Sequence, residues 1–511
     1  MTAPIRTDHF ASSHRTGDHP AKPLPHPGLA RLADRRLLKE LSYIDGRWTA
    51  ARDDARFAVT DPADGTLVAR VAALGADEAR EAVAAADRAF AAWKTLLPQV
   101  RAGLLRRWHD LMQEAAEDLA VLMTLEQGKP LAEARGEIAY AASFIAYYAE
   151  EALRVNVEGV TSHLPGAQMM LRREPVGVAA LLTPWNFPSA MLTRKAAAAL
   201  AAGCTVVAHP SSQTPLSALA LGELADRAGF PAGVVNIVTG QPAPIAETFC
   251  ADVRVRAVSF TGSTGIGRLV ARNAAATIKR VVMELGGHAP LIIFADADLD
   301  RAVEIAVAAK FATSGQDCLA ANRIYVERPL HERFASAFAA RVEALKVGPG
   351  LDEASEIGPL MHRAAVEKAQ AQIDDALARG ARRLAGERTM PGPLFLAPTV
   401  LADVPDDALI MREETFAPVA ALAPFDSEAE VVRRANATEY GLVAYVVTRD
   451  GARAARMAEA LDYGMVAINR VKITGAPVPF GGVKQSGLGR EGSRHGLEAF
   501  TDLKYVCLDL G

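Results

Sequence analysis

The chain has 511 residues, 50% of them hydrophobic and 23% charged, and its formal net charge at pH 7 is −4. This length exceeds one ordinary hydrophobic core and predicts two or three domains. The charge favours neither nucleic acid nor an anionic membrane as partner, and no run of 18 apolar residues predicts a transmembrane helix. The four cysteines are far apart and show no metal-ligand spacing, so we expect no metal site and a reducing, cytoplasmic location.

Closely spaced prolines and few large apolar side chains mark residues 1–38. Such a segment buries too little surface to offset its ordering entropy, so we expect a mobile arm there. Apolar residues at helical spacing then predict three amphipathic helices, at residues 77–97, 101–125 and 133–152. Residues 157–173 predict a hairpin that turns at Pro165 and Gly166.

From Val176 onward, short apolar runs alternate with helical patterns. This rhythm predicts a parallel sheet that is covered on both faces and binds ligands beyond the carboxyl ends of its strands. A second α/β region is expected over residues 290–471. A final strand is expected over residues 500–509, suited to pair with the 157–173 hairpin.

Cys318 stands on a small polar turn just before a β-branched run that predicts a strand. Gly315 lets the backbone bend there and keeps the thiol accessible. Free cysteines are more often packed as small hydrophobes, however, and only exposure and pKa decide whether a thiol is reactive. The turn by itself leaves both interpretations open.

Two further polar residues follow predicted buried strands. Prolines on both sides of Asn186 stiffen its loop, which suits an amide donor to a developing oxyanion, although Asn186 could equally cap the next helix. Glu284 precedes two glycines and could act as a general base with a raised pKa, or be an ordinary ion-paired surface glutamate. The glycine-rich turn that begins at Thr261 could admit a phosphate, but its GxxGxG spacing is not the dinucleotide fingerprint.

Six motifs in one order along the chain together resemble the NAD(P)-dependent aldehyde dehydrogenase superfamily. They are TPWNFP from Thr183, FTGSTGIG from Phe260, ELGG from Glu284, SGQDC ending at Cys318, EETFAP from Glu413 and PFGGVKQSGLGREGS from Pro479. The match runs from about Leu41 to the C-terminus. The run GGVKQSGLGREGS is most similar to the succinate-semialdehyde dehydrogenase branch.

The resemblance implies an α/β fold with a Rossmann-type cofactor domain and an α/β catalytic domain. The cofactor domain is expected at residues 39–155 and 175–287, and the catalytic domain at residues 288–485. A small β oligomerisation element is expected at residues 156–174 and 496–511. The implied partners are a small aldehyde substrate, NAD or NADP, and further copies of the chain in a dimer or tetramer.

The resemblance also implies five catalytic residues. Cys318 attacks the aldehyde carbonyl as a thiolate, while Asn186 and the Cys318 backbone N–H stabilise the oxyanion. Glu284 activates the water that hydrolyses the resulting thioester. Lys195 matches a lysine that supports this site, and Glu491 matches a proton-relay carboxylate.

Contacts to the cofactor are implied at nine positions in or near these motifs. They are Thr183, Trp185, His209, Ser212, Gly262, Ser263, Leu285, Glu414 and Phe416. Two of the nine depart from the family pattern. His209 replaces a lysine that binds the adenosine ribose, which weakens attraction to a 2′-phosphate, whereas Ser212 replaces a glutamate that would repel one. Because the two changes oppose each other, we expect both NAD and NADP to be used.

For the substrate, Arg194 matches one of two arginines that hold a distal carboxylate in the semialdehyde branch, but the other position is Ala312. Lys472 or Arg470 could supply the missing charge. The expected substrate is therefore a short semialdehyde such as succinate semialdehyde, with glutarate semialdehyde or a neutral aldehyde as alternatives. Glu284 favours hydrolysis over acyl transfer to coenzyme A, because it would be the base for water. A non-catalytic role is disfavoured because Cys318, Glu284 and Asn186 are all present. Cysteine hydrolase chemistry would need a histidine in these motifs.

Overall fold

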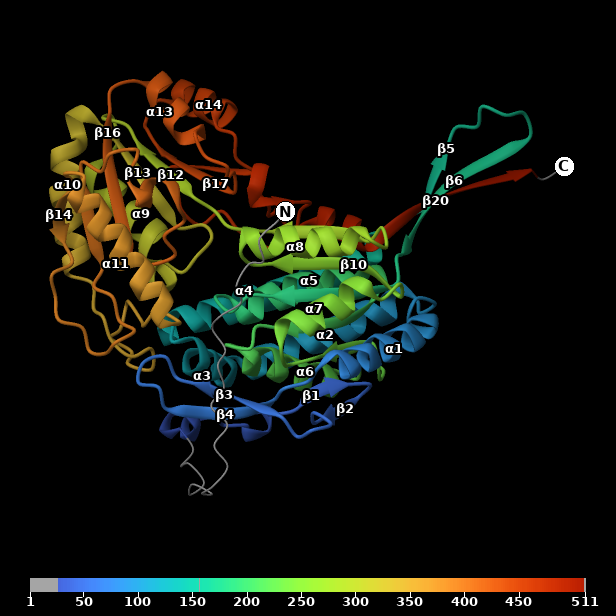
Figure 1. Cartoon of the computed structure of the whole chain (residues 1–511). Helices are drawn as coiled ribbons and strands as arrows, with labels where there is room; N and C mark the ends of the chain where they lie inside the picture. The colour runs from blue at the N-terminus through green and yellow to red at the C-terminus, as the bar shows by residue number, and fades with distance from the viewer. Residues whose placement is uncertain (1–25, 156, 510–511) are drawn as a thin grey trace, which may run out of the picture.

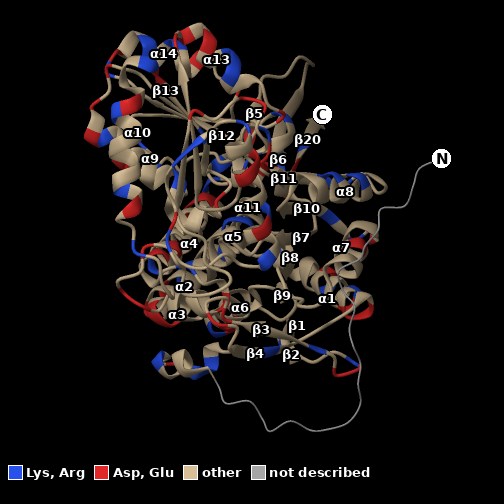
Figure 2. Cartoon of the chain, turned by 60° about the vertical axis from the view of Figure 1, so that its left-hand side comes forward, with Lys and Arg blue, Asp and Glu red and all other residues tan. Residues whose placement is uncertain are grey.

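The computed structural model describes residues 26–155 and 157–509. They form two α/β lobes and a ribbon of three strands that extends away from them (Figure 1). In the part of the chain that is described, no helix is both long and apolar enough to span a membrane. Outer helices such as α13 (Glu428–Asn436) and α14 (Gly451–Ala460) carry both positive and negative residues, whereas most strands carry few (Figure 2).

The first lobe is built on an eight-stranded sheet of order β19-β11-β10-β7-β8-β9-β1-β2. Its strands are β1 (Ser42–Ile44), β2 (Arg47–Thr49), β7 (Val178–Thr183), β8 (Thr205–Pro210), β9 (Val235–Ile237), β10 (Val255–Thr261), β11 (Arg280–Glu284) and β19 (Gly487–Leu488). Its helices are α1 (Ala76–Trp93), α2 (Pro98–Glu114), α3 (Ala116–Gln127), α4 (Leu131–Glu151), α5 (Pro188–Ala202), α6 (Pro215–Ala228), α7 (Pro242–Ala251) and α8 (Thr264–Ala275). A hairpin of β3 (Arg56–Thr60) and β4 (Leu67–Ala72) completes the lobe.

Strand β7 shows why this sheet needs helices on both faces. All six of its residues are buried, and alternate side chains enter opposite cores. Ala179 and Leu181 pack with α4, α5 and α6, whereas Val178 and Leu182 pack with α1, α7 and α8. The parallel pairing of β7, β8, β10 and β11 places their carboxyl ends at one edge, as the alternating pattern predicts.

The second lobe has a seven-stranded sheet of order β14-β15-β16-β13-β12-β17-β18. Its strands are β12 (Ala289–Ile293), β13 (Ala321–Glu327), β14 (Arg382–Ala385), β15 (Thr399–Ala402), β16 (Val419–Phe425), β17 (Val443–Val447) and β18 (Met465–Ile468). Its other helices are α9 (Leu299–Phe311), α10 (Arg328–Glu343), α11 (Arg363–Ala378) and α12 (Leu409–Arg412). Leu291 and Ile293 face the core beneath α9 and α10, while Ile292 faces the core beneath α11 and α13.

The ribbon joins segments that are far apart in sequence. Strands β5 (Glu158–Val160) and β6 (Ala167–Pro175) form the expected hairpin, and β20 (Thr501–Asp509) pairs with β6 along its whole length. Leu503, Tyr505 and Leu508 are all exposed on β20. The ribbon therefore presents apolar side chains that this copy of the chain does not cover. The three strands project away from both lobes (Figure 1).

One expectation about the first 130 residues is wrong in part, and one element there was not anticipated. The helix predicted over residues 101–125 is two helices, because Ala115 leaves helical geometry at φ −94° and ψ 11° between α2 and α3. The apolar spacing is helical on both sides of the break, so periodicity does not reveal it. The β3–β4 hairpin is an element that the sequence analysis did not anticipate.

The expected mobile arm over residues 1–38 is also wrong in part. Residues 1–25 lie outside the described residues, but residues 26–38 form two short 3₁₀ helices, η1 (Pro27–Arg31) and η2 (Arg35–Leu37). Leu29, Leu32 and Leu37 are buried in the core of the first lobe. The burial of these leucines offsets the ordering entropy that the prolines suggested would dominate.

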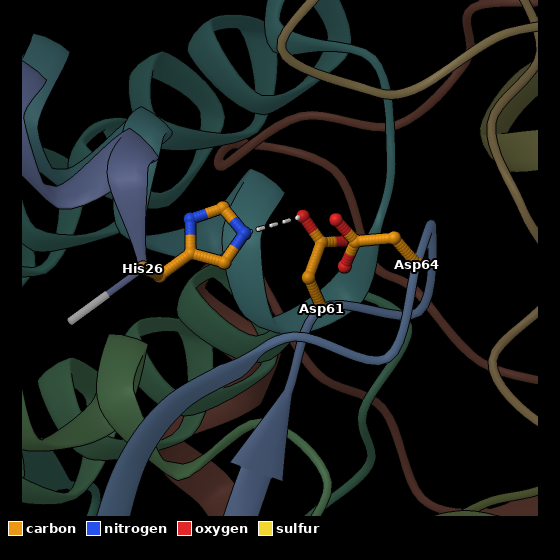
Figure 3. Close-up of side chains that lie close together, drawn as sticks. All are labelled: His26, Asp61 and Asp64. Atoms are coloured by element: carbon orange, nitrogen blue, oxygen red, sulfur yellow. Dashed lines mark ion pairs between the residues drawn. The ribbon is translucent and has the colours of Figure 1, made fainter. Parts of the chain in front are cut away.

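His26 fastens this segment to the β3–β4 hairpin. Its Nδ1 accepts a hydrogen bond from the Gly28 N–H at 3.0 Å, and its Nε2 lies 3.3 Å from Asp61 Oδ2 (Figure 3). Asp64 lies beyond Asp61 and receives the Thr66 N–H. Both ring nitrogens of His26 thus have partners within the protein. We call this cluster a structural latch, because it joins the segment 26–38 to the β3–β4 hairpin.

We expect His26→Ala to loosen residues 26–38 without disturbing the sheets. Loss of two partly buried hydrogen bonds costs about 1 kcal/mol, which corresponds to roughly fivefold faster local opening. Amide hydrogen exchange at Leu29 and Leu37 measures this, with His109→Ala, which removes an exposed histidine beside Asp110, as control. Unchanged exchange at both leucines would show that the latch contributes nothing.

Candidate active site

The carboxyl ends of β7, β10 and β11 carry three of the expected site segments. Thr183 ends β7, Thr261 ends β10 and Glu284 ends β11. The strands are neighbours in the sheet, and Thr261 is paired directly with Glu284. The strand-to-helix turns that follow therefore open on one edge of the first lobe, which faces the turn that carries Cys318.

A cavity of about 660 Å³ lies between the two lobes at this edge. It is lined by ten of the expected site residues, namely Trp185, Asn186, Arg194, Gly262, Ser263, Leu285, Cys318, Glu414, Phe416 and Lys472. Six others lie outside its lining, namely Thr183, Lys195, His209, Ser212, Glu284 and Glu491. Ala312, the position that lacks the second arginine, also lines the cavity.

Cys318 is partly exposed and lies between the 3₁₀ helix η4 (Ala312–Gly315) and β13. Thr313 and Ser314 both have positive φ, 51° and 56°, which is strained for side chains of this type. Glu133 holds the first by accepting the Thr313 N–H at 3.0 Å, and the Gly358 backbone holds the second through Ser314 Oγ. The turn that presents the thiol is thus held by partners outside it.

Asn186 is bonded directly to this turn. Its Nδ2 donates to the Gln316 carbonyl at 3.0 Å, and its own carbonyl accepts from Lys129 Nζ at 2.7 Å. Lys129 also pairs with Glu137 at 2.6 Å. The residue at the N-cap of α5 is Phe187, with no side-chain cap bond, so the alternative that Asn186 caps this helix is wrong. One amide hydrogen of Asn186 points to the turn and one remains for a ligand.

Glu284 is 2% exposed, and both of its carboxyl oxygens lack a hydrogen-bond partner among the described residues. The alternative of an ion-paired surface glutamate is therefore wrong. Burial, with the negative charge of Glu491 added to it, raises the pKa of Glu284 well above its ordinary value. A carboxyl group with a raised pKa is a stronger base than an ordinary glutamate once it is ionised, which suits a general base.

Glu491 is buried too but lies in a different electrostatic setting. It accepts hydrogen bonds from Arg194 Nε at 2.7 Å and Ser259 Oγ at 3.0 Å, and it forms an ion pair with Lys195. Burial alone would raise the pKa of Glu491, but Lys195 and Arg194 outweigh it and hold that pKa below the ordinary value. The environment thus moves the pKa values of the two carboxyls in opposite directions. Glu284 is shifted toward the protonated form and Glu491 toward the ionised form.

The thiol of Cys318 feels several of these charges. Burial and the carboxylates Asp317 and Glu414 raise its pKa well above the ordinary value, whereas Arg194 lowers it. The charge of Glu284 also raises the pKa of Cys318. The resting form is therefore the thiol, and positive charge brought into the cavity would favour the thiolate.

The residues present fit a dinucleotide. Thr183 Oγ1 and His209 Nε2, at the ends of adjacent strands, are buried and have no partner among the described residues. Burial lowers the pKa of His209 to about 4, so the imidazole is neutral at pH 7. The rings of Trp185 and Phe416 meet edge to face at 5.6 Å on one wall of the cavity, where an aromatic ligand can stack.

Glu414 and Gly287 join the second lobe to the first beside Cys318. Glu414 Oε1 accepts the Gly287 N–H at 2.9 Å. A β-carbon at Gly287 would lie 2.3 Å from the Cys318 carbonyl oxygen, closer than any side chain can approach. This glycine is required because two backbones touch there.

The sequence analysis missed the residues that hold the site's loops in place, two of which, Glu133 and Glu137, also line the cavity. Glu133 holds the Cys318 turn, and the Lys129–Glu137 pair holds the Asn186 loop. Glu137 Oε1 also accepts the Ser189 and Ala190 N–H groups at the start of α5. A lysine and a glutamate eight residues apart give no periodic signal, and the polar stretch around Lys129 does not indicate a buried charge.

Comparison with known proteins agrees with this geometry. The model of the aldehyde dehydrogenase family matches residues 48–506. An aspartate-semialdehyde dehydrogenase (non-phosphorylating) of Halomonas elongata is 52% identical over 94% of this chain and 97% of its own length. A succinate-semialdehyde dehydrogenase of Escherichia coli, named for NADP(+), is 50% identical over 94% of this chain and all of its own.

A solved structure of succinate-semialdehyde dehydrogenase from Burkholderia pseudomallei superposes with a TM-score of 0.93. The two chains are 48% identical, and the match covers 94% of this chain and all of the other. The α/β fold predicted from the six motifs is thereby confirmed. The chain therefore belongs to the aldehyde dehydrogenase family and is an NAD(P)-dependent oxidoreductase of that family.

Proposed function

We propose that this enzyme oxidises a short semialdehyde with a distal anionic group, such as succinate semialdehyde, to the carboxylate. One observation carries the proposal: the Cys318 thiol and the guanidinium of Arg194 line the same cavity. Nη1 of Arg194 is buried and has no partner among the described residues, so it can donate to an anion. The semialdehyde names of the relatives support the same substrate class.

Cys318 is the proposed nucleophile. As thiolate it adds to the aldehyde carbon, and the oxyanion that forms accepts from Asn186 Nδ2 and the Cys318 N–H. Bound NAD(P) would supply the hydride acceptor, and loss of hydride from this carbon would leave a thioester on Cys318. Glu284 takes a proton from the water that attacks the thioester, and the carboxylate product and free thiol are released. Lys195 and Glu491 are proposed to support proton movement behind Glu284.

The cofactor contacts are proposed on the same basis. Trp185, Phe416 and Leu285 provide apolar walls, and Glu414, fixed on the Gly287 N–H, is suited to bind a ribose hydroxyl. Gly262 and Ser263 begin the turn before α8, whose N-terminus suits a phosphate. His209, neutral and buried, and Ser212 neither attract nor repel a 2′-phosphate strongly.

The remaining expectations concern assembly and location. We infer that the exposed apolar side chains of β20 are covered by a second copy of the chain, which supports a homo-oligomer. All four cysteines are free thiols in the described structure, which suits a reducing compartment such as the cytoplasm.

An aldehyde panel assayed with NAD and with NADP tests the proposed function. We expect succinate semialdehyde to give a higher kcat/KM than butanal by roughly tenfold or more, since a charge-assisted hydrogen bond to Arg194 is worth about 1.5–3 kcal/mol. Absorbance of the reduced cofactor measures both, and both cofactors should give turnover. Glutarate semialdehyde and added coenzyme A complete the panel. Equal kcat/KM for charged and neutral aldehydes would overturn the substrate assignment. Strict use of one cofactor would overturn the expectation that both NAD and NADP are used.

Glu284→Gln should abolish hydrolysis while leaving hydride transfer intact. The raised pKa of Glu284 means that its basic form grows as pH rises, so the wild-type hydrolytic rate should increase with pH and the variant should lose this increase. We expect kcat to fall roughly 10²–10⁴-fold. Rapid mixing should still show one burst of reduced cofactor for each active site. Loss of the burst together with kcat would contradict the assigned role.

Lys472→Ala should raise KM for succinate semialdehyde and leave KM for butanal unchanged. Lys472 lines the cavity and could supply the positive charge that is missing at Ala312. Because Lys472 is exposed and its charge is screened by solvent, we expect KM to rise only roughly twofold to fivefold. Steady-state kinetics measures this, with Lys346→Ala, an exposed lysine outside the cavity, as control. Equal changes for the two aldehydes would exclude Lys472 as a charge receptor.

A further inference from the structure

The guanidinium of Arg194 has two different edges. Its Nε donates to Glu491 Oε2 at 2.7 Å, and its Nη2 contacts the sulfur of Met191 at 3.1 Å. Nη1 is the buried nitrogen without a partner among the described residues, and the side chain also lines the main cavity. The Nε edge is thus engaged by the buried carboxylate, while Nη1 is left without a hydrogen-bond partner among the described residues.

Phe480 holds both members of this pair. The guanidinium carbon of Arg194 lies 4.1 Å from the centroid of the Phe480 ring, as in a cation–π contact. Phe480 and Glu491 exchange backbone hydrogen bonds of 2.7 and 2.8 Å. Because the same residue stacks on the arginine and pairs with the glutamate, Arg194 and Glu491 keep a defined relative position.

The position of Arg194 and Glu491 matters because their charges affect the neighbouring Glu284. Two buried cations, Arg194 and Lys195, face the ionised Glu491, while Glu284 is kept toward its neutral form. Removing Arg194 would leave Glu491 with Lys195 and Ser259 alone, free to rotate toward them. It would also remove one of the cations that oppose the negative charge around Glu284.

We propose that Arg194 is a positioning residue for the hydrolytic half of the reaction in addition to binding the distal anion of the substrate. Its Nε edge keeps Glu491 oriented behind Glu284, and its Nη1 edge binds the substrate anion. Recognition of the substrate charge and alignment of the proton-carrying carboxylates are thus performed by one side chain. This inference rests on the proposed function for the identity of Glu284 as base.

A neutral aldehyde separates the two roles, because butanal has no charge for Arg194 to bind. We expect Arg194→Gln, assayed with butanal, to keep the burst of reduced cofactor and to lose kcat by roughly tenfold to a hundredfold, as expected for a group acting through a general base. Glu491→Gln should behave alike, and the double variant should be no slower than the slower single variant. Arg456→Gln, which breaks an exposed arginine–glutamate pair at 2.8 Å, is the matched control and should retain wild-type kcat.

Each outcome decides the matter. Wild-type kcat with butanal and a raised KM for succinate semialdehyde would confine Arg194 to substrate binding and overturn the inference, while the proposed function would stand. Loss of the burst would also overturn it, because the defect would then precede hydrolysis. Additive losses in the double variant would show that the two residues act separately. If Arg194→Gln fails to fold, Arg194→Lys is assayed in its place, with the same direction of effect expected from a shorter, non-bidentate donor.

Discussion

The hydrogen bond from Asn186 to the Gln316 carbonyl joins the two lobes at the point where chemistry is proposed to occur. Asn186 follows strand β7 of the first sheet, and Gln316 lies in the Cys318 turn, which precedes strand β13 of the second sheet. Each lobe folds around its own cores, so neither alone sets the distance between the amide and the thiol. The position of the nucleophile against its oxyanion donor therefore depends on how these two sheets are docked.

That docking is maintained by charged side chains in the wall of the cavity, Glu133 and Glu137, and by the buried Lys129. Lys129 and Glu137 fix the loop of Asn186, and Glu133 fixes the strained backbone at Thr313. Buried ion pairs contribute little net stability, because desolvation offsets their attraction, but they are costly to break singly. Here they serve to hold polar groups at defined angles, which is what preorganised catalysis requires.

Much of the site could be predicted from the sequence because each motif follows or precedes a strand. Position after or before a strand marked Asn186, Glu284 and Cys318 as candidates, and the family resemblance assigned their roles. The structure places Asn186 and Cys318 in the lining of one cavity, which also includes Leu285, the residue after Glu284. The pairing of Arg194 with Glu491 could not be predicted, since 297 residues separate them and no local pattern relates them. The break at Ala115 and the packing of Leu29 were missed for a similar reason, because both depend on tertiary contacts that local periodicity does not record.

The contact between Gly287 and the backbone of Cys318 has a consequence for how the enzyme can vary. At this junction the backbones of Gly287 and Cys318 are in direct contact, with no room for a β-carbon between them. The position of Cys318 therefore depends on Gly287 having no side chain. Substituents elsewhere on the cavity wall can be exchanged to suit one aldehyde or another. Gly287 cannot be exchanged in this way. A change of substrate must therefore come from substitutions in the cavity wall.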